Sequence, residues 1–312
     1  MSKYVFGIDL GGTSVKLGLL RESGELISKW EIPTPTENGG EAILPAIAES
    51  LSARLSGLGI DRAQVIGAGM GVPGAVLGDS YVEPCVNLGG WGGNVAEGLS
   101  ALCSLPVKVL NDANAAALGE MWQGGGKGSR NVVFVTLGTG VGGGIIIDGK
   151  LLSGVHGSGG EIGHIKVSVS EEESCGCGKK GCLEQYASAT GIVREAKRRL
   201  ASCSDSPLSA CAEVTAKDVF DCAKAGDKLA LEVVNVFADT LGRALAAVSC
   251  VCDPQVFVIG GGVSAAGKII TEAVEKSFRS YAFPAAEETL FTLASLGNDA
   301  GICGAARFLL DK

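Results

Sequence analysis

The sequence is short of positive charge. Its 26 Lys and Arg residues stand against 34 Asp and Glu, which gives a formal net charge of −8. A protein that holds nucleic acid through its phosphates needs a basic patch. The densest basic segment, Arg194 to Leu200, has the pattern of a solvent-exposed helix face. We therefore expect neither nucleic acid nor an anionic membrane as a partner.

The sequence also lacks a long apolar segment. Its N-terminus, MSKYVFGIDLGG, has no apolar h-region, so we expect no signal peptide. The longest uncharged run, Asn131 to Ile147, is interrupted by five glycines and is not a membrane span. We expect a cytoplasmic protein whose 11 cysteines serve as thiols and metal ligands rather than as disulfides.

Glycine, by contrast, is abundant, and it marks an internal repeat. The 48 glycines cluster at the ends of apolar runs, where a backbone turns sharply or approaches something closely. Tyr4 to Leu20 and Asn131 to Ile147 each contain a β-branched run, a Gly/Thr turn and a second apolar run, which predicts a β-hairpin. Strands alternate with helices after both hairpins. This pattern predicts two α/β lobes with a cleft between them.

Three glycine motifs resemble dinucleotide fingerprints but lack the required context. Two G-x-G-x-x-G segments begin at Gly69 and Gly138, and a G-x-G-x-x-A variant begins at Gly260. A fingerprint follows a strand, opens a helix and needs an acidic residue about 20 positions further on. The first two segments run into strands, and the third has no βαβ partner after it. The hairpins are then either phosphate-binding turns or plain turns that need positive φ.

The phosphate-binding interpretation gives roles to both hairpins. Backbone N–H groups and the hydroxyls of Thr13 and Thr139 would donate to phosphate oxygens. Asp9, just before the first turn, would hold Mg²⁺ directly or through water. Lys16 would add positive charge near the terminal phosphates.

Asn111 and Asp112 follow a short strand and open an Ala-rich helix. An aspartate at such a position is often only a helix N-cap. The alternative is a carboxylate at the cleft that accepts a hydroxyl proton during phosphoryl transfer and is kept ionised by the helix N-terminus. The sequence leaves both interpretations open.

The sharpest signal is a Cys₃His set, which indicates zinc. Its members are His164, Cys175, Cys177 and Cys182. Four protein ligands leave no open position, so the zinc would be structural. With one ring nitrogen on zinc, His164 would present a fixed N–H donor from the other. Glu161 and Glu184 flank the set as acceptors, and one donor with two acceptors suits sugar hydroxyls.

These residues resemble the ROK family of sugar kinases and sugar-responsive repressors. The resemblance runs from Asp9 to the C-terminal helix and rests on DLGGTSVK, NDANAAALGE, LGTGVGGGII, GEIGH and CGCGKKGCLE. Within the family, VNLGGW and EQYASATGIVREA look most similar to bacterial glucokinases. The sequence departs from many members at Val86, where they carry Pro, and at Ser14, where they carry Lys.

The resemblance implies an α/β fold of the two-lobed actin-like/hexokinase-type ATPase class, with ribonuclease H-like duplicated domains and a zinc-binding loop. Residues 1–111 with the C-terminal helix 298–312 would form a small lobe, and residues 112–297 a large lobe. Asp112 would be the catalytic base. The implied sugar contacts are Asn87, Asn111, Glu161, His164 and Glu184. The implied ATP contacts are Gly11, Gly12, Thr13, Thr139 and Gly140, with the nucleoside near Gly261 and Gly262.

We therefore expect a glucokinase that transfers the γ-phosphoryl group of MgATP to the 6-hydroxyl of glucose, and a homodimer, as is common in the family. A ROK kinase for N-acetylmannosamine, allose or fructose is the first alternative, because an acetamido group demands space rather than a new charge. A non-catalytic sugar sensor is the second. The family's repressors carry a DNA-binding domain ahead of this fold, and with a first strand at Tyr4 we expect none here.

Overall fold

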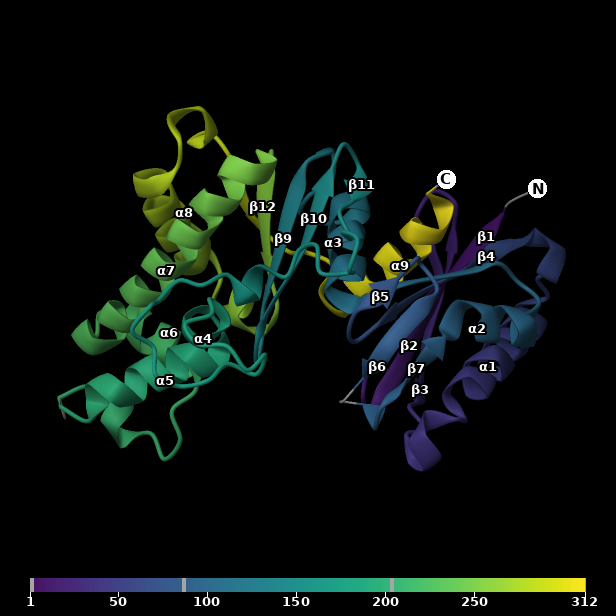
Figure 1. The fold of residues 1–312 in the computed structure, drawn as a ribbon, viewed down its shortest axis with the longest axis horizontal. Coiled ribbons are helices and arrows are strands. Elements are labelled where there is room, and N and C mark those ends of the chain that lie inside the picture. Colours follow the sequence, from purple (N-terminus) through teal and green to yellow (C-terminus); the bar gives the residue numbers. More distant parts are fainter. Residues whose placement is uncertain (1–2, 86–87, 203–204, 312) are drawn as a thin grey trace.

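The computed structural model describes residues 3–85, 88–202 and 205–311, and it has two α/β lobes side by side (Figure 1). Both chain ends lie in the same lobe. Each lobe is built on a five-stranded sheet. The ten cysteines that the structure describes are all free thiols.

The first sheet has the strand order β3-β2-β1-β4-β8. Its strands are β1 (Tyr4–Leu10), β2 (Ser14–Arg21), β3 (Leu26–Pro33), β4 (Val65–Val72) and β8 (Val107–Asn111). The first three strands run antiparallel, and β1, β4 and β8 run parallel. Helices α1 (Ile43–Leu58) and α2 (Val95–Cys103) pack against each other and contribute to the core of this lobe.

The second sheet repeats the first. Its order is β11-β10-β9-β12-β13, again with three antiparallel strands followed by parallel neighbours. Its strands are β9 (Val132–Leu137), β10 (Val141–Ile147), β11 (Lys150–Leu151), β12 (Val256–Gly260) and β13 (Leu290–Leu293). The internal repeat predicted from the two hairpins is therefore confirmed, and each hairpin occupies the same place in its sheet.

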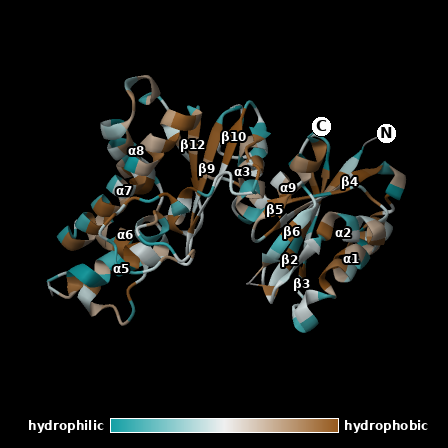
Figure 2. Cartoon of the chain, in the orientation of Figure 1, coloured by the Kyte–Doolittle hydropathy of each residue, from teal (hydrophilic) through white to brown (hydrophobic). Residues whose placement is uncertain are grey.

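Helices cover the second sheet and form the larger core. They are α4 (Glu184–Ala187), α5 (Ala189–Leu200), α6 (Ala216–Lys224), α7 (Lys228–Cys252) and α8 (Lys268–Tyr281). By length and composition α7 alone among the described helices could cross a membrane, but about two thirds of its apolar window is buried inside the lobe. Figure 2 shows the matching pattern, with hydrophobic strands in the interior and a hydrophilic face on α5. Short 3₁₀ segments occur at Glu37–Gly40, Arg62–Gln64, Ile162–His164, Pro207–Ala210, Gly262–Ala266, Pro284–Ala286 and Gly297–Asp299.

One small sheet was not predicted. It consists of β5 (Val76–Leu77), β6 (Tyr81–Cys85) and β7 (Trp91–Asn94). Its strands are short, and positive-φ glycines at positions 74, 78, 89, 90 and 93 interrupt the alternation that would have marked them. The sheet buries the ring of Trp91 in the first lobe.

Two helices, α3 (Asp112–Gln123) and α9 (Ala300–Leu310), pack against each other between the lobes (Figure 1). Their backbones come very close, since a Cβ on Gly304 would lie 1.6 Å from the carbonyl oxygen of Ala115. Helix α9 also packs on β1 and β4, so the C-terminal helix returns to the N-terminal sheet. Helix α3 contacts β9 and β10 as well. The predicted lobe boundary between residues 111 and 112 therefore falls at an element shared by both lobes, and it stays a prediction.

Candidate active site

A cleft of about 680 Å³ lies between the lobes and collects the charged residues that the sequence singled out. Both sheets contribute to it, as do the starts of α3, α4 and α9. Its ionisable lining residues are Asp9, Lys16, Asp112, Glu161, His164 and Glu184. A polar cleft lined from both lobes is a common place for a ligand.

The N-cap question at the start of α3 has a clear answer. Asn111 is the cap, because its Oδ1 accepts from the backbone N–H groups of Ala113 at 2.9 Å and Asn114 at 3.2 Å. Its Nδ2 donates to the carbonyl of Gly74 at 3.0 Å. Asp112 is the first helical residue, and its carboxylate lines the cleft while accepting from the N–H of Ala113 at 2.8 Å. Asn111 is therefore the N-cap of α3, and the side chain of Asp112 is free to face a ligand.

Asp112 is open to solvent inside the cleft, yet the protein around it removes part of its hydration. This burial raises the pKa of its carboxyl group, against the lowering effect of the helix N–H donors. Burial also raises the pKa of Asp9; the nearby Lys16 opposes that rise, and Asp112 adds to it. The two carboxylates thus share one cleft and influence each other.

Asp9 and Lys16 face each other across the first hairpin, as register partners in β1 and β2. Asp9 also lies against the first turn of α9, where a Cβ on Gly301 would be 2.8 Å from its carboxyl carbon. The positive end of α9 therefore faces this carboxylate. Only glycine at position 301 leaves the room that Asp9 occupies.

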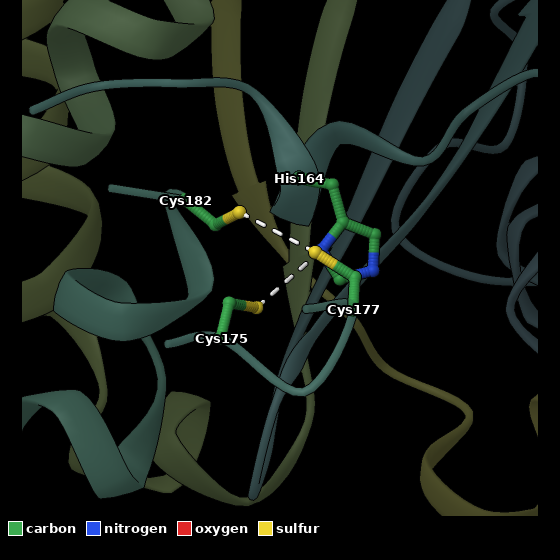
Figure 3. A group of neighbouring side chains, drawn as sticks. All are labelled: His164, Cys175, Cys177 and Cys182. Carbon is green, nitrogen blue, oxygen red and sulfur yellow. Dashed lines mark hydrogen bonds between the residues drawn. The ribbon is translucent and has the colours of Figure 1, made fainter. Parts of the chain in front are cut away.

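The Cys₃His set forms one compact cluster (Figure 3). The ligand atoms of His164, Cys175, Cys177 and Cys182 all lie within 4.8 Å of one another. The Sγ atoms of Cys177 and Cys182 are 3.7 Å apart, and Cys175 Sγ lies 3.8 Å from Nδ1 of His164. A tetrahedral zinc with Zn–S bonds of about 2.3 Å holds its sulfurs about 3.8 Å apart. These two separations match those of a tetrahedral zinc site.

The His164 ring faces two ways. Its Nδ1 points toward the sulfurs, and the other ring nitrogen points away from them (Figure 3). That second nitrogen, Nε2, is 3.9 Å from Oε2 of Glu161, which also lines the cleft. One imidazole thus joins the cysteine cluster to the cleft.

Glu184 makes a second connection between the cluster and the cleft. Its Oε1 lies 3.5 Å from Cys175 Sγ, and its Oε2 accepts from the backbone N–H of Val141 at 3.0 Å. This approach requires a glycine at position 140, where a Cβ would lie 2.2 Å from Oε2. The cysteine loop and the second hairpin are therefore held together through Glu184.

A separate pocket of about 510 Å³ adjoins the cleft at the second hairpin. Gly138 lines both cavities, while Thr139 and Gly262 line this one only. Gly261 has φ +82° and packs directly on Leu137, since a Cβ there would be 2.4 Å from the Leu137 carbonyl oxygen. The turn at residues 138–140 therefore separates a polar cleft from a more apolar pocket.

Some predicted residues lie outside these cavities. The first turn, Gly11, Gly12 and Thr13, does not line the cleft, although Asp9 and Lys16 on either side of it do. Asn111 lines a smaller cavity beside the cleft. Asn87 lies outside the described residues, as does Val86.

The cleft residues that the sequence interpretation missed include Pro73, Gly74, Asn298 and Gly301. Pro73 and Gly74 belong to the GVPG segment at the end of β4, Asn298 to the 3₁₀ segment before α9, and Gly301 to α9 itself. The available signal was the glycine at positions 74, 297 and 301, which marks close backbone approach. These glycines do not indicate which cavity the backbone approaches.

Comparison with known proteins decides the family, since the ROK family profile matches residues 5–312. The chain belongs to the ROK family. The resemblance of the sequence motifs is thereby confirmed, and so is the two-lobed α/β fold.

Two solved ROK structures share this fold. A ROK hexokinase from Thermus thermophilus has a TM-score of 0.83 and 33% identity, covering 97% of this chain and 96% of that one. A ROK family glucokinase from Streptomyces griseus, in complex with glucose and AMPPNP, has a TM-score of 0.76 and 34% identity, covering 98% of each chain. In sequence, this ROK protein is 44% identical over 308 residues to a glucokinase from Halalkalibacterium halodurans, covering 97% of this chain and 93% of that one.

Proposed function

We propose that this ROK protein is an ATP-dependent hexose kinase and that glucose is its substrate. The main observation behind this proposal is that a polar cleft and an adjoining pocket meet at Gly138. The cleft offers Asp112 with the sugar-type donor and acceptors of His164, Glu161 and Glu184. A nucleoside in the pocket at Thr139 and Gly262 would send its phosphates across the second hairpin toward Asp112. The relatives named glucokinase support glucose as the sugar.

In this proposal Asp112 orients the 6-hydroxyl and takes its proton as the γ-phosphoryl group transfers in line. Asp112 is the first residue of α3, and its carboxylate is held in place because Asn111 caps the helix and donates a hydrogen bond to Gly74. Asp9 and the phosphate oxygens would hold Mg²⁺, which neutralises phosphate charge when bound. Lys16, opposite Asp9, would add a further positive charge.

The first turn, Gly11 to Thr13, would reach the phosphates only when the lobes close. Closure would bring both hairpins onto the phosphate chain and exclude water from the reacting groups. The close backbone contact of α3 and α9 between the lobes makes these helices the natural hinge.

We assign the Cys₃His cluster to a structural zinc held by His164, Cys175, Cys177 and Cys182. All four positions of a tetrahedral ion would be filled, so the metal would not meet the sugar. It would instead fix the orientation of His164 and, through Cys175, the position of Glu184. We also propose that the protein is cytoplasmic and forms a homodimer. Light scattering on the purified chain tests the oligomeric state.

The proposal is tested with a coupled ADP assay over glucose, N-acetylmannosamine, allose, fructose and mannose. We expect the highest kcat/KM for glucose. A higher value for another sugar contradicts the glucose assignment and leaves the kinase assignment in place. Sugar binding by calorimetry without any ADP production contradicts the kinase assignment and favours a sugar sensor.

A further inference from the structure

A second large cavity, the rear pocket, lies at the opposite ends of α3 and α9 from the cleft. Asp112 opens α3 at the cleft, and Trp122, ten residues and about 15 Å further along the helix, lines the rear pocket. Helix α9 runs the same way, from Gly301 in the cleft to Arg307 in the rear pocket. The rear pocket has a volume of about 780 Å³, within the range of small-molecule sites. The proposed phosphoryl transfer does not use it.

The rear pocket is positively charged in an acidic protein. Four cations and two carboxylates line it, namely Lys108, Arg130, Lys150, Arg307, Asp148 and Asp311. A single carboxylate neutralises Arg307, whose Nη2 is 2.6 Å from Oδ1 of Asp311. Lys108 and Arg130 donate instead to backbone carbonyls, those of Asp311 at 2.8 Å and Asp148 at 2.7 Å. Among the residues that the structure describes, none forms a hydrogen bond or an ion pair with the side chain of Lys150.

Helix ends explain only part of this charge. The C-terminal turn of α9 favours cations, which accounts for Lys108 and Arg307 beside it. Arg130 belongs to the loop before β9, and Lys150 begins β11. Neither residue lies on a helix, although the C-terminal end of α3 at Trp122 lines the same pocket and also favours cations.

The cations already converge on one anion. The carboxyl group of Asp311 is partly buried, which raises its pKa, while Arg307, Lys108 and Lys150 each lower it. The other wall is apolar, with Met121, Trp122 and Leu151. The rear pocket therefore combines cations that can bind an anionic group with an apolar wall that can contact a compact organic group.

We propose that the rear pocket binds a small phosphate monoester, with the phosphate between Lys150, Arg130 and Lys108 and the organic part against Trp122 and Leu151. A phosphate monoester carries about two negative charges at neutral pH, which calls for more than one cation. Lys108 belongs to the first sheet, and Arg130 and Lys150 belong to the second lobe. A bound ester would therefore connect the two lobes behind the hinge helices.

The test uses the full chain with its cleft saturated by glucose and a non-hydrolysable ATP analogue, titrated with glucose 6-phosphate in a calorimeter. We expect one site, weakened at least tenfold by Lys150→Glu and by Arg130→Gln. The matched control is Lys276→Glu, an exposed cation on α8, which leaves the affinity unchanged. Equal affinity of the wild type and the Lys150→Glu variant, or no binding by the wild type at millimolar ester, overturns the proposal.

Two further measurements test whether the organic part of the ester is recognised and whether the rear pocket is separate from the proposed catalysis. Inorganic phosphate should bind more weakly than glucose 6-phosphate, and equal affinity overturns the assignment of an organic body. Lys150 is exposed and outside the cleft, so Lys150→Glu and Lys150→Gln should keep the basal kcat and both KM values. The binding difference between variants can be measured even on a chain without kinase activity, so the two proposals fail independently.

Discussion

Nε2 of His164 lies 3.9 Å from Oε2 of Glu161, while Nδ1 of the same ring lies 3.8 Å from the sulfur of Cys175. The ring therefore couples the cysteine cluster to the cleft. A change that disrupts the cysteine cluster therefore also frees His164 and its neighbour Glu161 in the cleft, although neither residue is substituted.

The Cys177→Ser variant tests this coupling. Cys177 is the exposed cysteine of the cluster, so its loss removes a metal ligand without opening a core cavity. We expect loss of bound zinc by elemental analysis, a lower Tm and a sugar KM raised about 10- to 100-fold, with a smaller change in the KM for ATP. Cys250→Ser, an exposed cysteine on α7, is the control. A zinc-free variant with normal sugar affinity would contradict the coupling.

The Asp112→Asn variant tests the base. The amide preserves the acceptor for the N–H of Ala113, and Asn111 still caps α3, so the helix should stay intact. We expect kcat to fall about 10²- to 10⁴-fold while sugar and ATP still bind. A variant within tenfold of the wild type in kcat would rule out the role as base.

The stability of Asp112→Asn should move in the opposite direction from its activity. Burial raises the folded-state pKa of Asp112, so the carboxyl group stabilises the fold when protonated, and that contribution is lost as the pH rises through the raised pKa. At pH 7 the wild type carries the desolvated charge and the asparagine variant does not. We expect a Tm equal to or above that of the wild type by differential scanning calorimetry. A clear drop in Tm would mean that the charge is stabilised in the fold.

The pH dependence of kcat/KM follows from the same shift. Asp112 accepts a proton only when ionised, so activity is full well above its pKa and is lost as the pH falls through it. Because burial raises that pKa above the ordinary value of ~3.9, the loss should begin at a higher pH than for an exposed aspartate. Stopped assays across pH 4–8, with circular dichroism to confirm folding, measure this. A profile that stays flat down to pH 4 would contradict it.

Two adjacent residues, Thr139 and Gly140, should have opposite effects. Thr139 lines the pocket assigned to the nucleoside, so Thr139→Ala should raise the KM for ATP more than that for sugar. Gly140→Ala places a Cβ 2.2 Å from the Glu184 carboxylate and should raise the sugar KM more. Steady-state kinetics in both substrates measure the split. The same pattern for both variants would show that the hairpin acts as one unit.

The fold was predictable where the hydrophobic pattern was strong. Both hairpins, the following strands and helices, and the duplication could be predicted from periodicity and turn residues. The small sheet around Trp91 could not, because its strands are short and rich in glycine.

The site was predictable in part, because side-chain chemistry is visible in a sequence and capping geometry is not. The Cys₃His spacing identified a cluster that does form. The sequence left open whether Asp112 caps α3 or faces the cleft, since aspartate favours the N-cap position. The cleft residues at the start of α9 were missed because no local pattern tells where a C-terminal helix docks. The rear pocket was missed because its cations come from four separate segments.

The docking of α9 has a consequence for how the protein is made. The first lobe has its own strands by residue 111, yet Ile302 and Ala306 of α9 are buried with Val5 and Leu20 in its core. These residues leave the ribosome after the strands of both sheets, so the lobe synthesised first waits for α9 to complete its interior. The large core of the second lobe contains no residue of α9 among those that the structure describes, so it can pack earlier.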